Sequence, residues 1–132
     1  LSICCSPSNY QLDCNGAGRF SSFCSASNYI TTSDQRIKTD FEFADPAECL
    51  RLVSAVKPRT YKRIDMNLAP RVGYVAQDWG RELSGGYRCI MGESADESGP
   101  LLAIDYSRIV PVLHGALLAA LARIEELESR VQ

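Results

Sequence analysis

The sequence predicts an α+β fold with a short β-rich N-terminal segment, a small mixed α/β body and a long C-terminal helix. Three observations support this class. Residues 1–32 are rich in Ser, Asn, Gly and Tyr with short apolar alternations, and residues 33–107 hold one capped helix start among short apolar runs. Residues 108–132 carry a heptad pattern. A chain of 132 residues is long enough for one domain, or one domain with an appendage.

The N-terminal segment carries a tight-turn signal. Residues 10–14 alternate between polar and apolar side chains, Asn15-Gly16 follows, and a second short run ends at Phe23. Asn-Gly between alternating runs predicts a hairpin. Because so short a segment has little apolar mass, we expect it to pack on the rest of the chain or on copies of itself.

The body begins with a predicted helix. Asp45 stands at the cap position with Pro46 in the first turn, and the pair Lys57-Pro58 marks the end of the helix. Four apolar residues fall on one face of this helix: Cys49, Leu52, Val53 and Val56.

Short strands are predicted to follow this helix. A Ser-Gly-Gly turn is expected at residues 84–86, and the acidic residues 92–100, which also hold Gly and Ser, are expected to form a solvated loop. The second strand reads as buried. The predicted strands are residues 60–64, 72–76, 87–91 and 101–104.

Residues 108–132 are predicted to form one long helix, with Pro111 in its first turn, where a missing N–H does no harm. Apolar residues recur at alternating spacings of three and four, which defines a heptad seam. An amphipathic helix packed on its own domain would explain this pattern. However, the last turns contain almost only seam residues and charged residues, which favours packing against a partner helix in another subunit. The seam comprises Val110, Leu113, Leu117, Ala120, Ile124, Leu127 and Val131.

The composition of the chain limits the kinds of molecule that it is expected to bind. A net charge of −2 and a pI near 5.4 disfavour nucleic acid and an anionic membrane. No uninterrupted apolar run approaches ~20 residues, so no transmembrane helix is expected. The first residues lack a signal-peptide pattern, and Leu1 in place of a start methionine suggests a piece of a longer polypeptide.

The chain has six cysteines, four of them within the first 24 residues: Cys4, Cys5, Cys14 and Cys24. None has the close spacing of metal ligands, and the single histidine, His114, is distant in the sequence. We therefore expect no metal and no cofactor. We interpret the cysteines as small buried apolar side chains made in a reducing compartment, with zinc binding and disulfides as less favoured alternatives.

The hexapeptide from Ser33 to Lys38 places a hydroxyl, an amine and two flanking charges in one short segment. A serine needs a base to become a nucleophile, and a lysine can serve when burial or a neighbouring cation such as Arg36 favours its neutral form. If the intervening residues turn back, the Lys38 amine reaches the Ser33 hydroxyl. Attack on the Thr32 carbonyl through a five-membered ring would then give an ester that water opens.

A simpler interpretation of this hexapeptide is structural. Ser33-Asp34 before a charged run is often only a helix cap or a turn. Asp34 and Arg36 would then form an ordinary surface pair that contributes little to stability.

Residues 32–41, Thr-Ser-Asp-Gln-Arg-Ile-Lys-Thr-Asp-Phe, resemble the start of the intramolecular chaperone domain of phage endosialidases, tail spikes and tail fibres. A similar domain occurs in myelin regulatory factor. The resemblance continues through residues 56–62, 72–78 and 104–111, in the order of the family, and ends with the C-terminal helix. Residues 9–24 are similar to the fibre segment that often precedes the domain.

The resemblance implies a homotrimeric C-terminal domain of a viral fibre or spike, made in the host cytoplasm and carried on the virion. Such a domain aligns three chains through a trimeric coiled coil, promotes folding of the β-rich shaft ahead of it, and often cuts itself off. The catalytic serine and lysine map onto Ser33 and Lys38, with Arg36 in a supporting position. The cut falls beside Ser33, between Thr32 and Ser33 or between Ser33 and Asp34.

Other positions of the resemblance are interpreted as structural. Tyr61, Gln77 and Tyr106 match recurrent positions of the family. Cys14 stands where an aliphatic residue is usual, and Trp79 with the shortened segment after it is less typical. These departures leave the details of the subunit interface open.

Two other functions remain open from the sequence. A non-cleaving trimerisation and attachment tip would keep the fold and stay joined to the shaft, and the chain does run unbroken through Ser33. The processing domain of a membrane-bound transcription factor would be supported by an upstream basic region or a downstream hydrophobic span, and the sequence displays neither.

Overall fold

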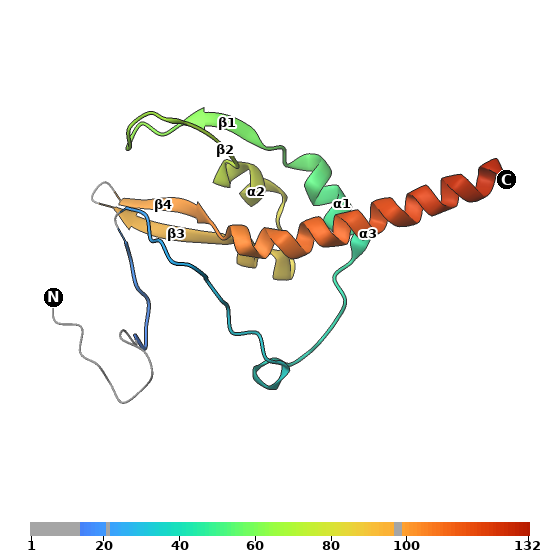
Figure 1. Ribbon diagram of the computed structural model, residues 1–132, viewed down its shortest axis with the longest axis horizontal. Coiled ribbons are helices and arrows are strands. Elements are labelled where there is room, and N and C mark those ends of the chain that lie inside the picture. The colour runs from blue at the N-terminus through green and yellow to red at the C-terminus, as the bar shows by residue number, and fades with distance from the viewer. Residues whose placement is uncertain (1–13, 21, 97–98) are drawn as a thin grey trace. The chain divides into compact units, whose positions relative to one another are not determined.

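The computed structural model describes residues 14–20, 22–96 and 99–132 (Figure 1). The chain divides into two compact units, residues 1–40 and residues 41–132. The predictions for Cys4, Cys5 and most of the first arm of the N-terminal hairpin lie outside the described residues.

The described residues of the first unit contain one short helix and no strand. Asn15 and Gly16 lie in a bend, as the tight-turn signal predicts, but no strand pairing flanks it in the described part. Gln35–Ile37 form η1, a single turn of 3-10 helix, and every described residue of this unit is exposed. Large apolar side chains such as Phe23 and Ile30 are therefore left exposed, and pairing of two strands alone is marginal in water.

The second unit begins with helix α1 (Pro46–Ala55), which confirms the predicted helix. The Asp45 side chain accepts a hydrogen bond from the Ala47 N–H at 3.0 Å, which satisfies one of the free donors of the first turn. The predicted apolar face is the buried one, since Cys49 and Leu52 are fully buried.

An antiparallel hairpin of β1 (Arg59–Lys62) and β2 (Pro70–Gly73) follows, with Arg59 opposite Gly73. The prediction of a buried strand at residues 72–76 is wrong in extent and burial, because the strand ends at Gly73 and Val72 is 74% exposed. The remaining apolar residues of that run lead into a helix. A short apolar run does not by itself distinguish these two outcomes.

Helix α2 (Ala76–Glu82) follows, and the 3-10 helix η2 (Gly85–Ile90) occupies the region of the predicted turn and third strand. Gly85 has a φ of 56°, in the left-handed region that glycine adopts without a steric penalty. The strand prediction for residues 87–91 is wrong. Tyr87 and Ile90, three residues apart, both turn inward, which is the period of a 3-10 helix rather than the alternation of a strand.

Strands β3 (Met91–Asp96) and β4 (Gly99–Ile104) form a second antiparallel hairpin, with Met91 opposite Ile104. The predicted loop at residues 92–100 is therefore mostly strand, whereas the predicted strand at 101–104 is confirmed as part of β4. A two-stranded ribbon exposes much of both faces, so polar residues can form it without apolar alternation. Leu101 and Leu102 are accordingly both 46% exposed.

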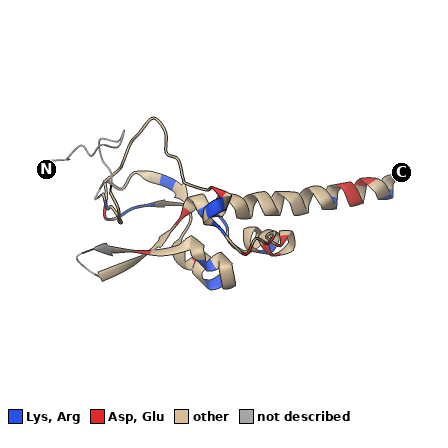
Figure 2. Cartoon of the chain, turned by 90° about the horizontal axis from the view of Figure 1, so that it is seen from below, with Lys and Arg blue, Asp and Glu red and all other residues tan. Residues whose placement is uncertain are grey.

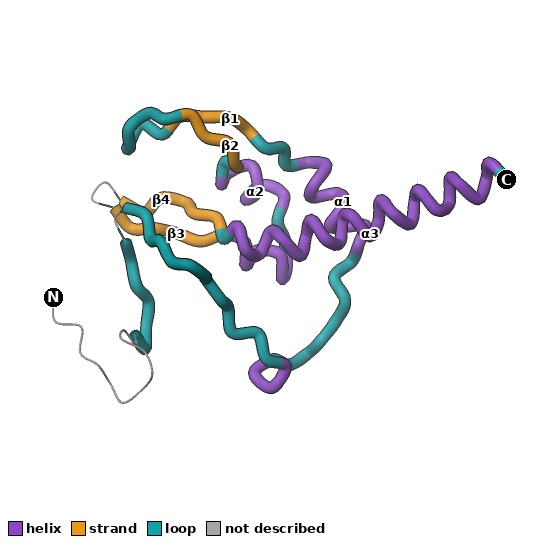
Figure 3. Tube along the Cα trace, viewed as in Figure 1, coloured by secondary structure: helices purple, strands orange, loops and turns teal. Residues whose placement is uncertain are grey.

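Helix α3 (Tyr106–Val131) starts earlier than predicted because Asp105 caps it, accepting a hydrogen bond from the Ser107 N–H at 3.1 Å. Pro111 consequently lies in the second turn rather than the first. Helix α3 runs beside α1 and then continues past it, away from both hairpins (Figures 1 and 3).

Helix α3 has two apolar faces. Ile109, Val112 and Ala116 are buried in the core with residues of α1, α2 and η2. The predicted seam lies on another face, where Val110 is 61% and Leu117 57% exposed. Charged residues are confined to the two ends of α3, as Figure 2 illustrates. Packing on the body thus explains one face and leaves the seam without cover, so a coiled coil with another subunit stays a prediction.

Helix α3 is also long and apolar enough to cross a membrane, by length and composition alone. The expectation of no transmembrane helix considered only uninterrupted apolar runs, and it stays a prediction. Mostly buried core helices meet the same criterion, but only 17% of the qualifying window of α3 is buried, and a single helix of this kind carries little weight. This finding is therefore weak support for a membrane span.

Candidate functional site

The segment from Ser33 to Lys38 forms a closed turn in the first unit. Asp34 caps η1, its side chain accepting a hydrogen bond from the Arg36 N–H at 2.8 Å. The Lys38 N–H then donates to the Gln35 carbonyl at 3.1 Å. This is the turn on which the sequence-based mechanism depended, and it is built entirely from hydrogen bonds within the hexapeptide.

The turn brings the two predicted site residues into contact. Lys38 Nζ donates a hydrogen bond to Ser33 Oγ at 2.5 Å. An ammonium group at this distance donates to the hydroxyl, whereas a neutral amine would accept a hydrogen bond from it. To act as a base it must lose one proton and then accept the hydrogen bond from the hydroxyl. The 2.5 Å distance meets the geometric requirement for that transfer.

Arg36 is directed to Asp34. Its guanidinium binds the carboxylate in a bidentate pair, with Nε–Oδ1 and Nη2–Oδ2 distances of 3.0 Å. The Arg36 side chain lowers the pKa of Asp34, and its backbone N–H lowers it further. Because the carboxylate offsets the guanidinium charge, Arg36 is poorly placed to favour a neutral lysine. Its contribution in this structure is to hold the turn.

The site is open to solvent in the single chain. Thr32, Ser33 and Lys38 are all exposed, and the same holds for the other described residues of the first unit. Water stabilises the charged amine and competes for the hydroxyl, so these residues alone meet the geometric but not the electrostatic requirement for catalysis.

The three other positions matched by the resemblance lie in the second unit. Tyr106 Oη accepts a hydrogen bond from the Tyr74 N–H at 2.9 Å, and a Cβ at Gly73 would lie 2.6 Å from Tyr106 Oη and 3.0 Å from Tyr61 Oη. Tyr61 and Tyr106 thus enclose the end of β2, which agrees with a structural role. Gln77 lines a groove.

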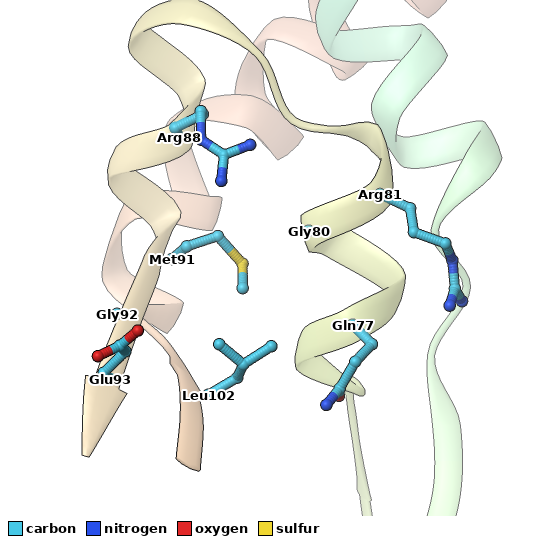
Figure 4. A pocket seen from close by; sticks show the side chains of 8 residues that line it. All are labelled: Gln77, Gly80, Arg81, Arg88, Met91, Gly92, Glu93 and Leu102. Carbon is cyan, nitrogen blue, oxygen red and sulfur yellow. The ribbon is translucent and has the colours of Figure 1, made fainter. Parts of the chain in front are cut away.

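That groove, which we call the α2–η2 groove, has a volume of about 780 Å³. It lies between α2, η2 and the β3–β4 hairpin (Figure 4). The sequence interpretation missed it because residues 87–91 were assigned to a strand, and no local pattern marks it. Its lining comprises Gln77, Gly80, Arg88, Met91, Gly92 and Leu102, with Arg81 and Glu93 at the margins.

The described cysteines are free thiols. Cys49 is fully buried, which confirms its interpretation, but Cys14, Cys24 and Cys89 are exposed, so the interpretation is wrong for them. The first two lie in the exposed first unit, where nothing covers them within the described part of the chain. Among residues 14–20, 22–96 and 99–132, no group of three or more His, Cys, Asp or Glu residues could hold a metal ion.

Comparison with known families identifies the class of protein. Residues 33–83 match the family described as chaperone of endosialidase, and the match begins at Ser33. This match supports an endosialidase-type intramolecular chaperone domain that includes these residues, and the family is one of phage or virion tail-associated proteins. No curated protein matches the chain.

Proposed function

We propose that this chain trimerises at the C-terminus of a viral fibre or spike, holds the shaft ahead of it in register, and then cuts itself off beside Ser33. The observation that carries the proposal is the 2.5 Å contact between Lys38 Nζ and Ser33 Oγ, at the start of the segment that matches the chaperone family. The mature fibre or spike would reside on the virion.

The cleavage chemistry uses atoms of the hexapeptide and its neighbour. Lys38, once neutral, removes the Ser33 hydroxyl proton as Oγ attacks the Thr32 carbonyl carbon. The C–O bond forms, the Thr32–Ser33 C–N bond breaks, and the Lys38 ammonium returns the proton to the departing Ser33 nitrogen. Water then hydrolyses the ester, which leaves a Thr32 carboxylate and a Ser33 with a free amine and its hydroxyl restored.

Assembly supplies what the single chain lacks. Neighbouring chains that cover the turn would remove water from Lys38 and so favour its neutral form. The exposed seam of α3 provides the surface for this assembly, since seam residues such as Leu117 and Ile124 are 57% and 49% exposed. Cleavage would therefore follow trimer formation rather than precede it.

This order of events suits the folding of a long β shaft. Shaft contacts are non-local and lie between chains, so they form slowly. A domain that trimerises quickly raises the local concentration of the three shafts. Removal of the domain afterwards leaves the shaft kinetically trapped in its folded form.

Denaturing electrophoresis of the longer protein tests the proposal. The unaltered protein should give two bands, while Ser33→Ala and Lys38→Ala should each give one. Lys62→Ala, at an exposed lysine of β1, is the matched control and should leave two bands. A mass measurement on the released piece identifies the bond, since a piece that begins at Asp34 would contradict the Thr32–Ser33 assignment. Two bands from Ser33→Ala would refute the proposal that Ser33 and Lys38 carry out the cleavage.

A non-cleaving trimerisation and attachment tip is the second candidate. The observation in its favour is the exposure of Ser33 and Lys38, because an exposed amine is a poor base for a serine. One band from the unaltered protein and from every variant, with a trimer in light scattering, would support this function instead.

A further inference from the structure

The residues between Lys38 and α1 expose two aromatic side chains. Phe43 is fully exposed and Phe41 is 69% exposed, and the exposed Glu42 lies between them. This acidic-aromatic segment ends at Asp45, which caps α1. Two large apolar side chains this exposed within three residues indicate a binding surface.

The α2–η2 groove has the complementary chemistry. Figure 4 shows Arg88, Met91 and Leu102 extending into the space that faces Gly80. A Cβ at Gly80 would lie 3.4 Å from Met91 Cε, so the absence of a side chain there keeps the groove open. Met91 and Leu102 form an apolar floor with a cation, Arg88, beside it.

Arg88 is the cation of this groove that is available to a partner. Its Nη1 donates to the Leu83 carbonyl at 3.3 Å, and among the described residues no carboxylate pairs with it. Arg81, by contrast, is paired with Asp78 at 2.5 Å.

We propose that the segment Phe41-Glu42-Phe43 of one copy docks in the α2–η2 groove of a second copy. An aromatic ring on the floor would contact the Met91 sulfur and Leu102, contacts that are favourable for a thioether and an aliphatic side chain. Glu42 would pair with Arg88 in a charge-assisted hydrogen bond. This inference rests on the proposed trimer and adds to it a contact separate from the α3 seam.

A second copy fits better than the same chain, because segment and groove lie on different sides of η2. Glu42 and Phe43 line a pocket with Tyr87 and Cys89, whereas the α2–η2 groove takes Arg88 and Met91. Two different patches on one subunit make a head-to-tail contact, which closes into a ring when the rotation permits. A trimer would contain three identical contacts of this kind.

Docking of this segment would also affect the Ser33–Lys38 pair. Phe41 follows Lys38 by three residues, so docking anchors the chain directly after the catalytic turn, and only in assembled copies. Assembly and activation of the Ser33–Lys38 pair are then linked by the covalent chain itself.

Photo-crosslinking tests whether the segment of a second copy occupies the α2–η2 groove. A benzoylphenylalanine at position 43, in the 132-residue chain, is irradiated after isotopically heavy and light chains are refolded together. We expect heavy–light crosslinks from position 43 to residues of the groove, such as Gly80, Met91 and Leu102. Crosslinks found only within one chain, or only outside the groove, would overturn the proposal.

A charge swap tests the recognition. Glu42→Arg and Arg88→Glu should each raise the concentration of half-assembly by ~10-fold or more, and the double variant should return to within about threefold of the unaltered chain. Ile64→Ala, at a 93% exposed aliphatic side chain, is the control and should change nothing. Single variants that assemble normally, or a double variant as weak as the singles, would overturn the docking.

The two proposals fail in distinguishable ways. If Glu42→Arg has no effect while Leu117→Asp on the seam abolishes the trimer and cleavage, docking is wrong and the proposed function stands. If the unaltered chain is monomeric at all concentrations, both proposals are wrong.

Discussion

Replacement of Gly115 by alanine is expected to destabilise the body where α1 crosses α3. A Cβ at Gly115 would lie 2.6 Å from Cys49 Sγ and 2.9 Å from Cys49 Cβ, closer than non-bonded atoms approach. Cys49 is fully buried and its Cβ is fixed to the backbone of α1, so relief of the contact requires the helix itself to move.

The magnitude follows from two opposing terms. Overpacking of a core costs ~1–3 kcal/mol, whereas glycine to alanine in a helix interior gains ~1 kcal/mol. Because the Cys49 Cβ can move only with the backbone of α1, we expect the upper part of that range and a net loss of ~1–2 kcal/mol in the free energy of unfolding. For a chain of this size, the melting temperature should fall by ~3–8 °C.

Urea unfolding followed by fluorescence measures this change. Trp79 is the only tryptophan and is 1% exposed, so its emission reports on the core. Chain concentration must be equal in all samples, because assembly adds to apparent stability. Gly86→Ala is the control, since a Cβ there meets nothing within 4 Å. Cys49→Ala combined with Gly115→Ala removes the shorter contact and should recover part of the loss. A Gly115→Ala chain as stable as the unaltered one would refute the reasoning.

Three further predictions concern other parts of the chain. Gly73→Ala should lower the melting temperature because its Cβ would lie 2.6 Å from Tyr106 Oη, and a smaller loss is expected when Tyr106→Phe removes that oxygen. Hydrogen bonds lower the pKa of Asp105, and the bond from the Ser107 side chain has the largest effect. The stability that this cap contributes is therefore fully present above the ordinary aspartate pKa, and it is lost as the pH falls through the lowered pKa of the folded state. Urea unfolding between about pH 6 and pH 2 should therefore show a steeper acid loss for the unaltered chain than for Asp105→Asn; equal slopes would contradict this cause. Asp34→Asn keeps an acceptor for the turn but removes the charge that binds Arg36, so cleavage of the longer protein should slow without stopping; an unchanged rate in a time course would show that the pair does not position the dyad.

Local features of this chain were predictable from the sequence. The start of α1 was, because a capping aspartate and a first-turn proline act within a few residues of each other. The approach of Lys38 to Ser33 was also predictable, since one turn of chain joins them. The exposure of Cys14 was not predictable, because burial of a thiol depends on what the rest of the chain places around it.

The region from residue 72 to residue 100 depended on non-local contacts. Short apolar runs there are compatible with strand or helix, and the choice is made by what each run packs against. Ile90 is 1% exposed because η2 turns it into a core shared with α1 and α3, which no pattern within residues 87–91 indicates.

Helix α3 shows most clearly what is determined by the sequence and what is decided only by the tertiary structure. The sequence by itself determined that residues near 108–132 form a helix with a heptad seam, because a repeat of three and four residues is a property of the chain alone. Only the tertiary structure decided which face the body uses. Gly115 lets α1 approach closely at Cys49, so the face with Ile109 and Val112 is buried and the seam is left exposed. The physical reason is that periodicity identifies apolar faces, whereas steric fit between helices selects the one that is buried.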